Sequence, residues 1–365
     1  MAAPPASAPN QRRARVSVLG DLFCDVVATN VAALPEWGGD ARTDSVGMYA
    51  GGSAANVASH LRSLARSRAD GADADVTLFA ALGETGDAVE HMLARHLREA
   101  GVELDAVRVP GTTIGTCIVL SGASDRAFVS CSGSTGALRL ADLPLDRVAD
   151  ADHLHVGGVF MLHSLSRDLG AMLDRVLERN PHMTVSLDTN FDGSGAWGRD
   201  YLPDVIRRVH VVKLNEAEAM GVSGAESAEE AARRLARLAK TAAVVTLGKR
   251  GCVACSRDGR VVRVPAPRVP RVVDSTGAGD AFSAGLLSEW LASPVRDADA
   301  CLRATRFAVR SGAAAATHVG ACATLLTHAG VDALCDSWDS PASSGRATPA
   351  ASPTPPPLPV SAPTA

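Results

Sequence analysis

Asp274-Ser-Thr-Gly-Ala-Gly-Asp-Ala-Phe-Ser-Ala-Gly285 is the stretch of this chain that decides its fold and most of its chemistry. It follows a strand-like run, Arg271 to Val273, and predicts a helix that reaches about Trp290. A strand, a glycine-rich loop and a helix in succession are typical of sites that bind anions through backbone N–H groups.

Three small residues, Gly277, Ala278 and Gly279, stand where the predicted helix begins. Unpaired N–H groups and the positive end of the helix dipole can converge on an anion there. Asp280 falls in the first helical turn, beside this anion site. A favourable first-turn charge is the plain structural alternative for that aspartate. Phosphoryl transfer, however, needs both backbone donors and a carboxylate that takes the proton of the acceptor hydroxyl. We therefore expect Asp280 to be the catalytic base.

The same stretch resembles the C-terminal signature of the PfkB (ribokinase-like) carbohydrate kinases. The family's N-terminal signature is matched by Ala50-Gly-Gly-Ser-Ala-Ala-Asn-Val-Ala58, more than 200 residues upstream. Two motifs in the family's order are more specific than either alone, and the resemblance runs from about Val16 to Leu326. It implies an ATP-dependent kinase that phosphorylates a hydroxyl of a small sugar, as a ribokinase or fructokinase does.

The resemblance also implies where the acceptor binds. Asp25, which ends the segment Gly20-Asp-Leu-Phe-Cys-Asp25, would bind its hydroxyls together with Gly51, Gly52 and Asn56. Asn190 is a further candidate, although the basic residue often found shortly after it in the family is missing. Each of these residues also has an ordinary structural explanation, such as a turn or a helix start.

ATP and Mg²⁺ are expected on the other side of the site. Asn215 and Glu218 match the family's NxxE motif, whose Asn and second Glu organise Mg²⁺ and the phosphates, largely through water, and Glu218 is the expected metal residue. Thr246, Gly248 and Gly251 match its GxxG nucleotide loop, and no Walker A pattern or strand-linked GxGxxG is present.

A monovalent cation, K⁺ in particular, lies behind the anion hole in ribokinase-like members. Asp274 and Thr276 match the first half of that site. Ala315, Gly320 and Thr324 could provide the second half.

Short apolar runs alternate with helical patterns, which predicts a parallel sheet covered on both faces. The expected strands are Val16 to Gly20, Val76 to Leu82, His153 to Val159, Thr184 to Asp188, Val209 to Leu214 and Ala243 to Leu247. The expected helices are Ser53 to Ala65, Ala88 to Ala100, Ser166 to Arg179 and Ser227 to Lys240. The fold class is thus α/β, a Rossmann-like ribokinase-type sandwich with a small β-sheet lid.

The domain plan has three parts. Residues 1–14 and 336–365 are expected to be a disordered leader and a disordered tail rich in Pro, Ser and Ala. Residues 15–335 form the kinase domain, with lid segments near 26–48 and 102–131. The second segment carries β-rich runs on either side of a turn at 122–125.

Charge and composition exclude some functions. Lys and Arg number 36 against 40 Asp and Glu, which leaves a formal charge of −4 and no basic field for nucleic acid. No run of 18 apolar residues supports a membrane span. Eight scattered cysteines, of which Cys252 and Cys255 form an isolated CxxC, are expected to be reduced. A cytoplasmic location follows, although the arginine-rich leader leaves organelle targeting open.

The prediction of whether the acceptor carries a phosphate rests on Ser53. Family members that handle phosphosugars, and ribokinases as well, often carry Lys directly after the glycine pair, where this chain has Ser53. An unphosphorylated acceptor is therefore favoured. A nucleoside kinase and a catalytically inactive regulatory paralogue remain alternatives, and the intact Asp280 argues against the second. Edge strands of the lid could pair two chains as a homodimer.

Overall fold

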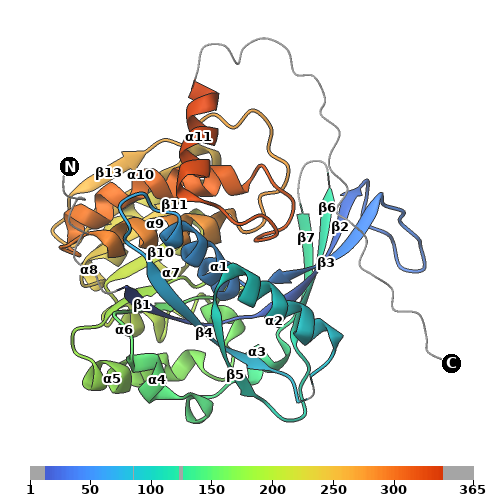
Figure 1. The fold of residues 1–365 in the computed structure, drawn as a ribbon, viewed down its shortest axis with the longest axis horizontal. Coiled ribbons are helices and arrows are strands. Elements are labelled where there is room, and N and C mark those ends of the chain that lie inside the picture. Colours follow the sequence, from blue (N-terminus) through green and yellow to red (C-terminus); the bar gives the residue numbers. More distant parts are fainter. Residues whose placement is uncertain (1–12, 85, 123–125, 340–365) are drawn as a thin grey trace, which may run out of the picture.

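The computed structural model describes residues 13–84, 86–122 and 126–339. It consists of a large sheet with helices on both faces and a small sheet that stands to one side (Figure 1). Most of the expected leader, the turn at 123–125 and most of the expected tail lie outside the described residues.

The large sheet has nine strands in the order β13-β12-β11-β10-β9-β8-β1-β4-β5. Their bounds are β1 (Ala14–Leu19), β4 (Ala74–Leu82), β5 (Glu103–Arg108), β8 (His153–Val156), β9 (Thr184–Leu187), β10 (Val211–Asn215), β11 (Ala242–Thr246), β12 (Cys252–Ser256) and β13 (Val261–Val264). Neighbours from β5 to β11 pair in parallel, and β12 and β13 add an antiparallel edge. The parallel α/β prediction is confirmed.

The helices cover both faces of the large sheet. They are α1 (Ser53–Arg66), α2 (Ala88–Ala100), α3 (Gly133–Ala137), α4 (Leu145–Ala149), α5 (Leu169–Arg179), α6 (Leu202–Ile206), α7 (Glu216–Ser223), α8 (Ala228–Leu238), α9 (Ala278–Ala292), α10 (Ala298–Ala315) and α11 (His328–Asp339). Helix α11 continues past residue 335, into the segment expected to be a tail, where Arg310 of α10 pairs with Asp336.

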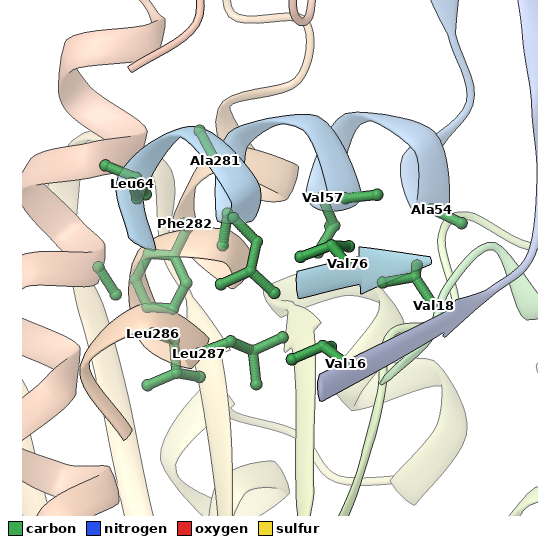
Figure 2. Packing of buried hydrophobic residues seen from close by; sticks show 14 of the residues in the cluster. Val16, Val18, Ala54, Val57, Leu64, Val76, Ala281, Phe282, Leu286 and Leu287 are labelled. Carbon is green, nitrogen blue, oxygen red and sulfur yellow. The ribbon is translucent and has the colours of Figure 1, made fainter. Parts of the chain in front are cut away.

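Successive side chains along the strands point to opposite faces of the sheet and pack into two separate hydrophobic cores. Val16 and Val18 of β1 point to the face covered by α1, α9 and α10, whereas Leu19 points to the face of α5 and α8. Figure 2 shows the first core, where Val57 of α1 and Phe282 of α9 pack over the strands. Helices α1 and α9 pack side by side on this face, and their first turns meet where Ser53 donates a hydrogen bond to Asp280.

The small sheet is the expected lid. It comprises β2 (Phe23–Val31), β3 (Ser45–Gly51), β6 (Gly115–Gly122) and β7 (Arg126–Cys131), in the order β3-β2-β6-β7. The outer ends of these strands project away from the large sheet (Figure 1).

Two local predictions were wrong. The segment 103–108, expected in the lid, is β5 of the large sheet, because it follows the crossover helix α2 and pairs in parallel with β4. Arg271 to Val273 is not a strand, and Val272 and Val273 are 58% and 44% exposed. Apolar character alone cannot distinguish such an exposed loop from a buried strand.

Candidate active site

The first turn of α9 lies at the centre of the candidate site. Gly277 is its N-cap with a φ of 72°, and a Cβ there would lie 2.6 Å from the Cα of Ala321, so only glycine fits. The backbone N–H groups of the first helical turn have no carbonyl acceptor within the helix, because no helical turn precedes them. The amide of Ala278 makes a long turn bond of 3.3 Å to the carbonyl of Ser275. The left-handed N-cap at Gly277 therefore gives the helix start the backbone form that an anion hole at this position would need.

Asp280 projects from this turn toward α1. Its Oδ1 accepts a hydrogen bond from Ser53 Oγ at 2.8 Å, and its Oδ2 accepts one from Asn56 Nδ2 at 2.8 Å. Burial raises the pKa of Asp280 to about 7, with Asp188 adding to the rise and Lys213 opposing it. A carboxyl group with such a pKa is suited to accept a proton near neutral pH.

Asp25 faces this carboxylate from strand β2 of the lid. It is buried, and burial together with the charges of Asp21, Asp280 and Asp274 raises its pKa to about 7. A Cβ on Gly51 would collide with the Asp25 carboxyl group, which explains glycine at that position. The structure therefore brings together Asp25, Asn56 and Asp280, as the sequence predicted.

Asp21 is a residue that the sequence reasoning missed. Its carboxylate accepts hydrogen bonds from the backbone N–H groups of Ser53 at 2.9 Å and Ala54 at 2.8 Å, and so caps α1. Gly52 has a φ of 94°, and a Cβ there would lie 2.5 Å from the carbonyl oxygen of Asp21. Asp21 thus fixes the helix turn that presents Ser53 and Asn56 to Asp280.

Lys213 was missed as well. It lies in β10, is buried, and its Nζ is 2.5 Å from Asp188 Oδ2, directly beyond β9. A single lysine within the apolar run Val-Val-Lys-Leu-Asn was the available signal. Asn190 follows Asp188 with a φ of 59°, and its backbone N–H donates to Asp188 Oδ1 at 3.4 Å. The structure therefore places Asn190 at this edge of the sheet, next to Asp188.

A cavity of about 630 Å³ lies beside α9, where the nucleotide is expected. It unites the predicted residues of the GxxG loop with those of the helix start, namely Thr246, Gly248, Gly251, Ala278 and Gly279. Its lining also includes two cations and several apolar residues that the sequence did not single out, among them Lys249, Arg268, Val269, Phe282 and Val309. Cations suit phosphates and apolar walls suit a planar base.

The NxxE residues form a capping box. Asn215 Oδ1 accepts from the N–H of Glu218, while the Glu218 carboxylate accepts from the backbone N–H of Asn215 at 2.8 Å and from its Nδ2 at 2.6 Å. Burial raises the pKa of Glu218 to about 7, and Asp188 adds to the rise. Both carboxylate oxygens are thus already engaged, which fits Mg²⁺ held through water and phosphate rather than in a closed cage. No group of three or more metal-binding side chains occurs in the described part of the chain.

The residues expected around a monovalent cation are partly brought together. Asp274 Oδ1 accepts from the backbone N–H of Thr276 at 2.9 Å and from its Oγ1 at 2.6 Å, while Oδ2 accepts from the N–H of Gly320 at 3.0 Å. Ala315 is buried near the end of α10, and Thr324 is exposed in the loop beyond it. The oxygen donors are of the type that K⁺ prefers.

Arg126 of the lid reaches the same loop. Its NH1 donates to Thr276 Oγ1 at 2.6 Å and lies 3.6 Å from Asp274 Oδ1. Arg126 shares a face of β7 with Ser130, and Ser130 pairs through Cys117 of β6 with Asp25 of β2. The lid therefore carries a guanidinium group on the same face as Asp25.

Comparisons with known proteins agree with this geometry. The sequence model described as "pfkB family carbohydrate kinase" matches residues 13–328. The chain belongs to this family, and it is a phosphotransferase of the carbohydrate-kinase class.

Relatives in several organisms resemble it over most of their length. The chain is 29% identical over 326 residues to an ATP-dependent ribose-1-phosphate kinase of Halopiger xanaduensis, covering 86% of this chain and 98% of that protein. It resembles the ribokinase of Arabidopsis thaliana complexed with ribose and ATP, with a TM-score of 0.71 and 20% identity over 89% and 99% of the two chains. A fructokinase double mutant of Vibrio cholerae, bound to fructose, ADP and potassium ion, gives a TM-score of 0.70 and 24% identity over 88% and 98%. The predicted ribokinase-type fold is confirmed.

Within the described part of the chain, no helix is both long and apolar enough to span a membrane.

Proposed function

We propose that this chain transfers the γ-phosphate of ATP to a hydroxyl of a small, unphosphorylated sugar, with Asp280 as the base. The position of Asp280 carries this proposal. It is hydrogen-bonded to Ser53 and Asn56 on one side, and it follows two residues of α9 that line the nucleotide cavity. The names of the ribokinase and fructokinase relatives support a sugar acceptor.

The proposed reaction is a phosphoryl transfer in one step. The acceptor oxygen forms a bond to the γ-phosphorus, the bond between that phosphorus and ADP breaks, and the Asp280 carboxylate takes the hydroxyl proton. Backbone N–H groups of Gly277, Ala278 and Gly279 stabilise the charge on the transferred group. Asn215 and Glu218 would organise a Mg²⁺ ion, largely through water, and the ion would neutralise phosphate charge.

An uncharged acceptor suits the side of the site that faces Asp25. The charge of Asp280 raises the pKa of Asp25, and that of Asp188 raises the pKa of Asp280, so a phosphate dianion beside these carboxyl groups is disfavoured. The side chain of Asn56 donates to Asp280, while its buried Oδ1 has no partner among the described residues. That oxygen is a hydrogen-bond acceptor next to the base, suited to a sugar hydroxyl.

A sugar phosphate is the second candidate acceptor, and Arg126 is the observation that favours it. A phosphate under the lid needs an arginine or lysine, and Arg126 lies on the substrate-facing side of β7. The Halopiger relative is named for ribose 1-phosphate, which points in the same direction. A nucleoside remains a third candidate, because neutral ribosides satisfy the same hydroxyl contacts.

A coupled assay of ADP release, with ribose, fructose, adenosine, ribose 1-phosphate and fructose 6-phosphate as acceptors, tests the proposal. We expect the highest kcat/KM for an unphosphorylated acceptor. If ribose 1-phosphate is best and Arg126→Ala lowers its kcat/KM while leaving that of ribose unchanged, the sugar-phosphate candidate replaces it. No acceptor-dependent turnover at all would indicate an inactive paralogue.

We also propose a cytoplasmic homodimer that pairs through the outer face of the lid. Four apolar side chains are exposed there, Val46 at 62%, Met48 at 46%, Ile118 at 42% and Val129 at 62%. Met48, Ile118 and Val129 fall in one cross-strand row through Val26. All eight cysteines are free, as suits a reducing compartment. Sedimentation of the wild type against Ile118→Glu measures whether this face holds a dimer.

A further inference from the structure

A buried ion pair lies directly beneath the anion hole. The register of β9 and β10, which pairs Val212 with Leu187, places Lys213 beside Asp188 one residue further along. Their side chains are 8% and 1% exposed, and Nζ and Oδ2 are 2.5 Å apart. Buried ion pairs are seldom more stabilising than apolar residues of the same volume, because both charges lose water. Stability alone is therefore a weak explanation for this pair.

Two contacts tie the pair to the first turns of α9. A Cβ on Gly279 would lie 3.3 Å from the Nζ of Lys213, so the ammonium group sits against the backbone of the anion hole. Ser283, one turn beyond Asp280, donates from its Oγ to Asp188 Oδ2 at 3.3 Å. The pair thus supports the helix start from below.

Several charged groups surround Lys213 and Asp280. Burial tends to lower the pKa of Lys213, but Asp188, Glu218 and Asp280 together hold it above its usual value. The groups that face Asp280 come from different elements, namely Asp25 of β2, Asp188 beyond β9, Lys213 of β10, Glu218 of α7 and Cys322 of the last loop. His155 of β8 lies next to the ion pair, and burial lowers its pKa to about 4, so it is neutral at working pH.

We propose that Lys213 is a positioning residue of the kinase site: held by Asp188 against the backbone of Gly279, its ammonium group orients the helix start that presents Asp280 and receives the phosphoryl group. Lys213 neither gives nor takes a proton in the step. The inference rests on the proposed role of Asp280 as the base.

Because Lys213 and Asp188 carry opposite charges, removing each one should move the acid limb of the pH profile in an opposite direction. Lys213→Met removes an attraction that favours ionised Asp280, so the acid limb of the pH profile of kcat/KM moves to higher pH, by about 1 unit. Asp188→Asn removes a repulsion, so the limb moves to lower pH. Lys213→Arg keeps the charge and leaves the limb near that of the wild type. A loss of kcat of roughly 10²-fold accompanies Lys213→Met, because the anion hole loses its support.

The experiment measures pH profiles of kcat/KM for the wild type and these variants with the best acceptor of the panel, and it tests the proposed role of Lys213. Lys240→Met is the matched control, since Lys240 lies far from the site, beside Arg208 and Asp174, and its profile is expected to stay unchanged. If Lys213→Met does not fold, the isosteric Asp188→Asn still tests the direction of the shift. An active wild type whose variants lose rate without moving the acid limb in opposite directions overturns the inference alone. A wild type without any kinase activity overturns the proposed function, and the inference with it.

Discussion

Asn56 Nδ2 donates a hydrogen bond of 2.8 Å to Asp280 Oδ2, joining two residues that are 224 positions apart in the chain. Ser53, one turn earlier on α1, holds the other oxygen of the same carboxylate. Two helix N-termini therefore meet at one side chain, and α1 fixes the direction in which Asp280 points. The proposed base belongs to α9 and is thus held by residues of α1.

Asp280→Asn removes the base and keeps its shape. We expect kcat to fall by roughly 10²–10⁴-fold, the range for loss of a general base. ATP binding should remain, because the nucleotide cavity is lined by the backbone and side chains of other residues. Steady-state kinetics together with calorimetric titration of ATP measure the two effects.

The matched control for that variant is Asp146→Asn. Asp146 also lies in the first turn of a helix, α4, but it is 87% exposed and its ion pair with Arg179 is on the surface. We expect its kcat to equal that of the wild type. Turnover by Asp280→Asn at a comparable rate would remove Asp280 from the chemistry.

Local motifs of the candidate site could be predicted from sequence because each is a short run of glycine and polar residues. Asp25, Asn56, Asn215 and Asp280 were identified without knowledge of the neighbouring strands, since these short runs carry the signal. Their proximity follows from the rule that ligands bind at the carboxyl ends of parallel strands.

Contacts that depend on strand register could not be predicted in the same way. Lys213 meets Asp188 only because β9 lies beside β10, and no spacing in the sequence encodes that neighbourhood. Asp21 caps a helix that begins more than 30 residues later. The edge strand β5, Glu-Leu-Asp-Ala-Val-Arg, alternates charged and apolar residues because it is partly exposed, so it resembles a lid strand more than a buried one.

Stability should depend on pH through the two carboxyl groups of the site. The pKa values of Asp25 and Asp280 are about 7 in the folded chain, above the usual value of 3.8. The folded state therefore binds more protons than the unfolded state between about pH 4 and pH 7, and these groups contribute stability at low pH that is lost as pH rises through 7. Asp25→Asn should raise the Tm of the unliganded protein at pH 8 and change it little at pH 5. A lower Tm at pH 8 would contradict the raised pKa of Asp25.

The variant Gly51→Ala tests whether acceptor binding depends on the position of the Asp25 carboxyl group. Gly51→Ala places a Cβ against the Asp25 carboxyl group, so we expect KM for the acceptor to rise by roughly tenfold or more while the Kd for ATP stays constant. Gly193→Ala is the control, because a Cβ there meets nothing within 4 Å and its φ is not in the left-handed region. Equal acceptor KM values in the two variants would show that Asp25 tolerates displacement.

The dependence of kcat on K⁺, in the wild type and in Arg126→Ala, tests the expected monovalent cation site. We expect K⁺ to raise kcat more than Na⁺ does, because Asp274 and Gly320 match the proposed cation site. The guanidinium group of Arg126, 3.6 Å from Asp274 Oδ1, supplies part of the positive charge there, so Arg126→Ala should depend more steeply on K⁺. Rates of both proteins in potassium, sodium and tetramethylammonium salts provide the comparison. Identical rates in all three salts would eliminate the monovalent site.

The proposed acceptor site is divided between two sheets, since Asp25 lies on the lid whereas Ser53, Asn56 and Asp280 lie on the main sandwich. A sugar bound as proposed would contact all of these groups only while the lid is closed. Its apparent affinity is then the intrinsic affinity multiplied by the fraction of molecules whose lid is closed. Substitutions that favour closure, even on the outer face of β3 or β6, would tighten acceptor binding without touching a single sugar contact, and they would do so by the same factor for every acceptor.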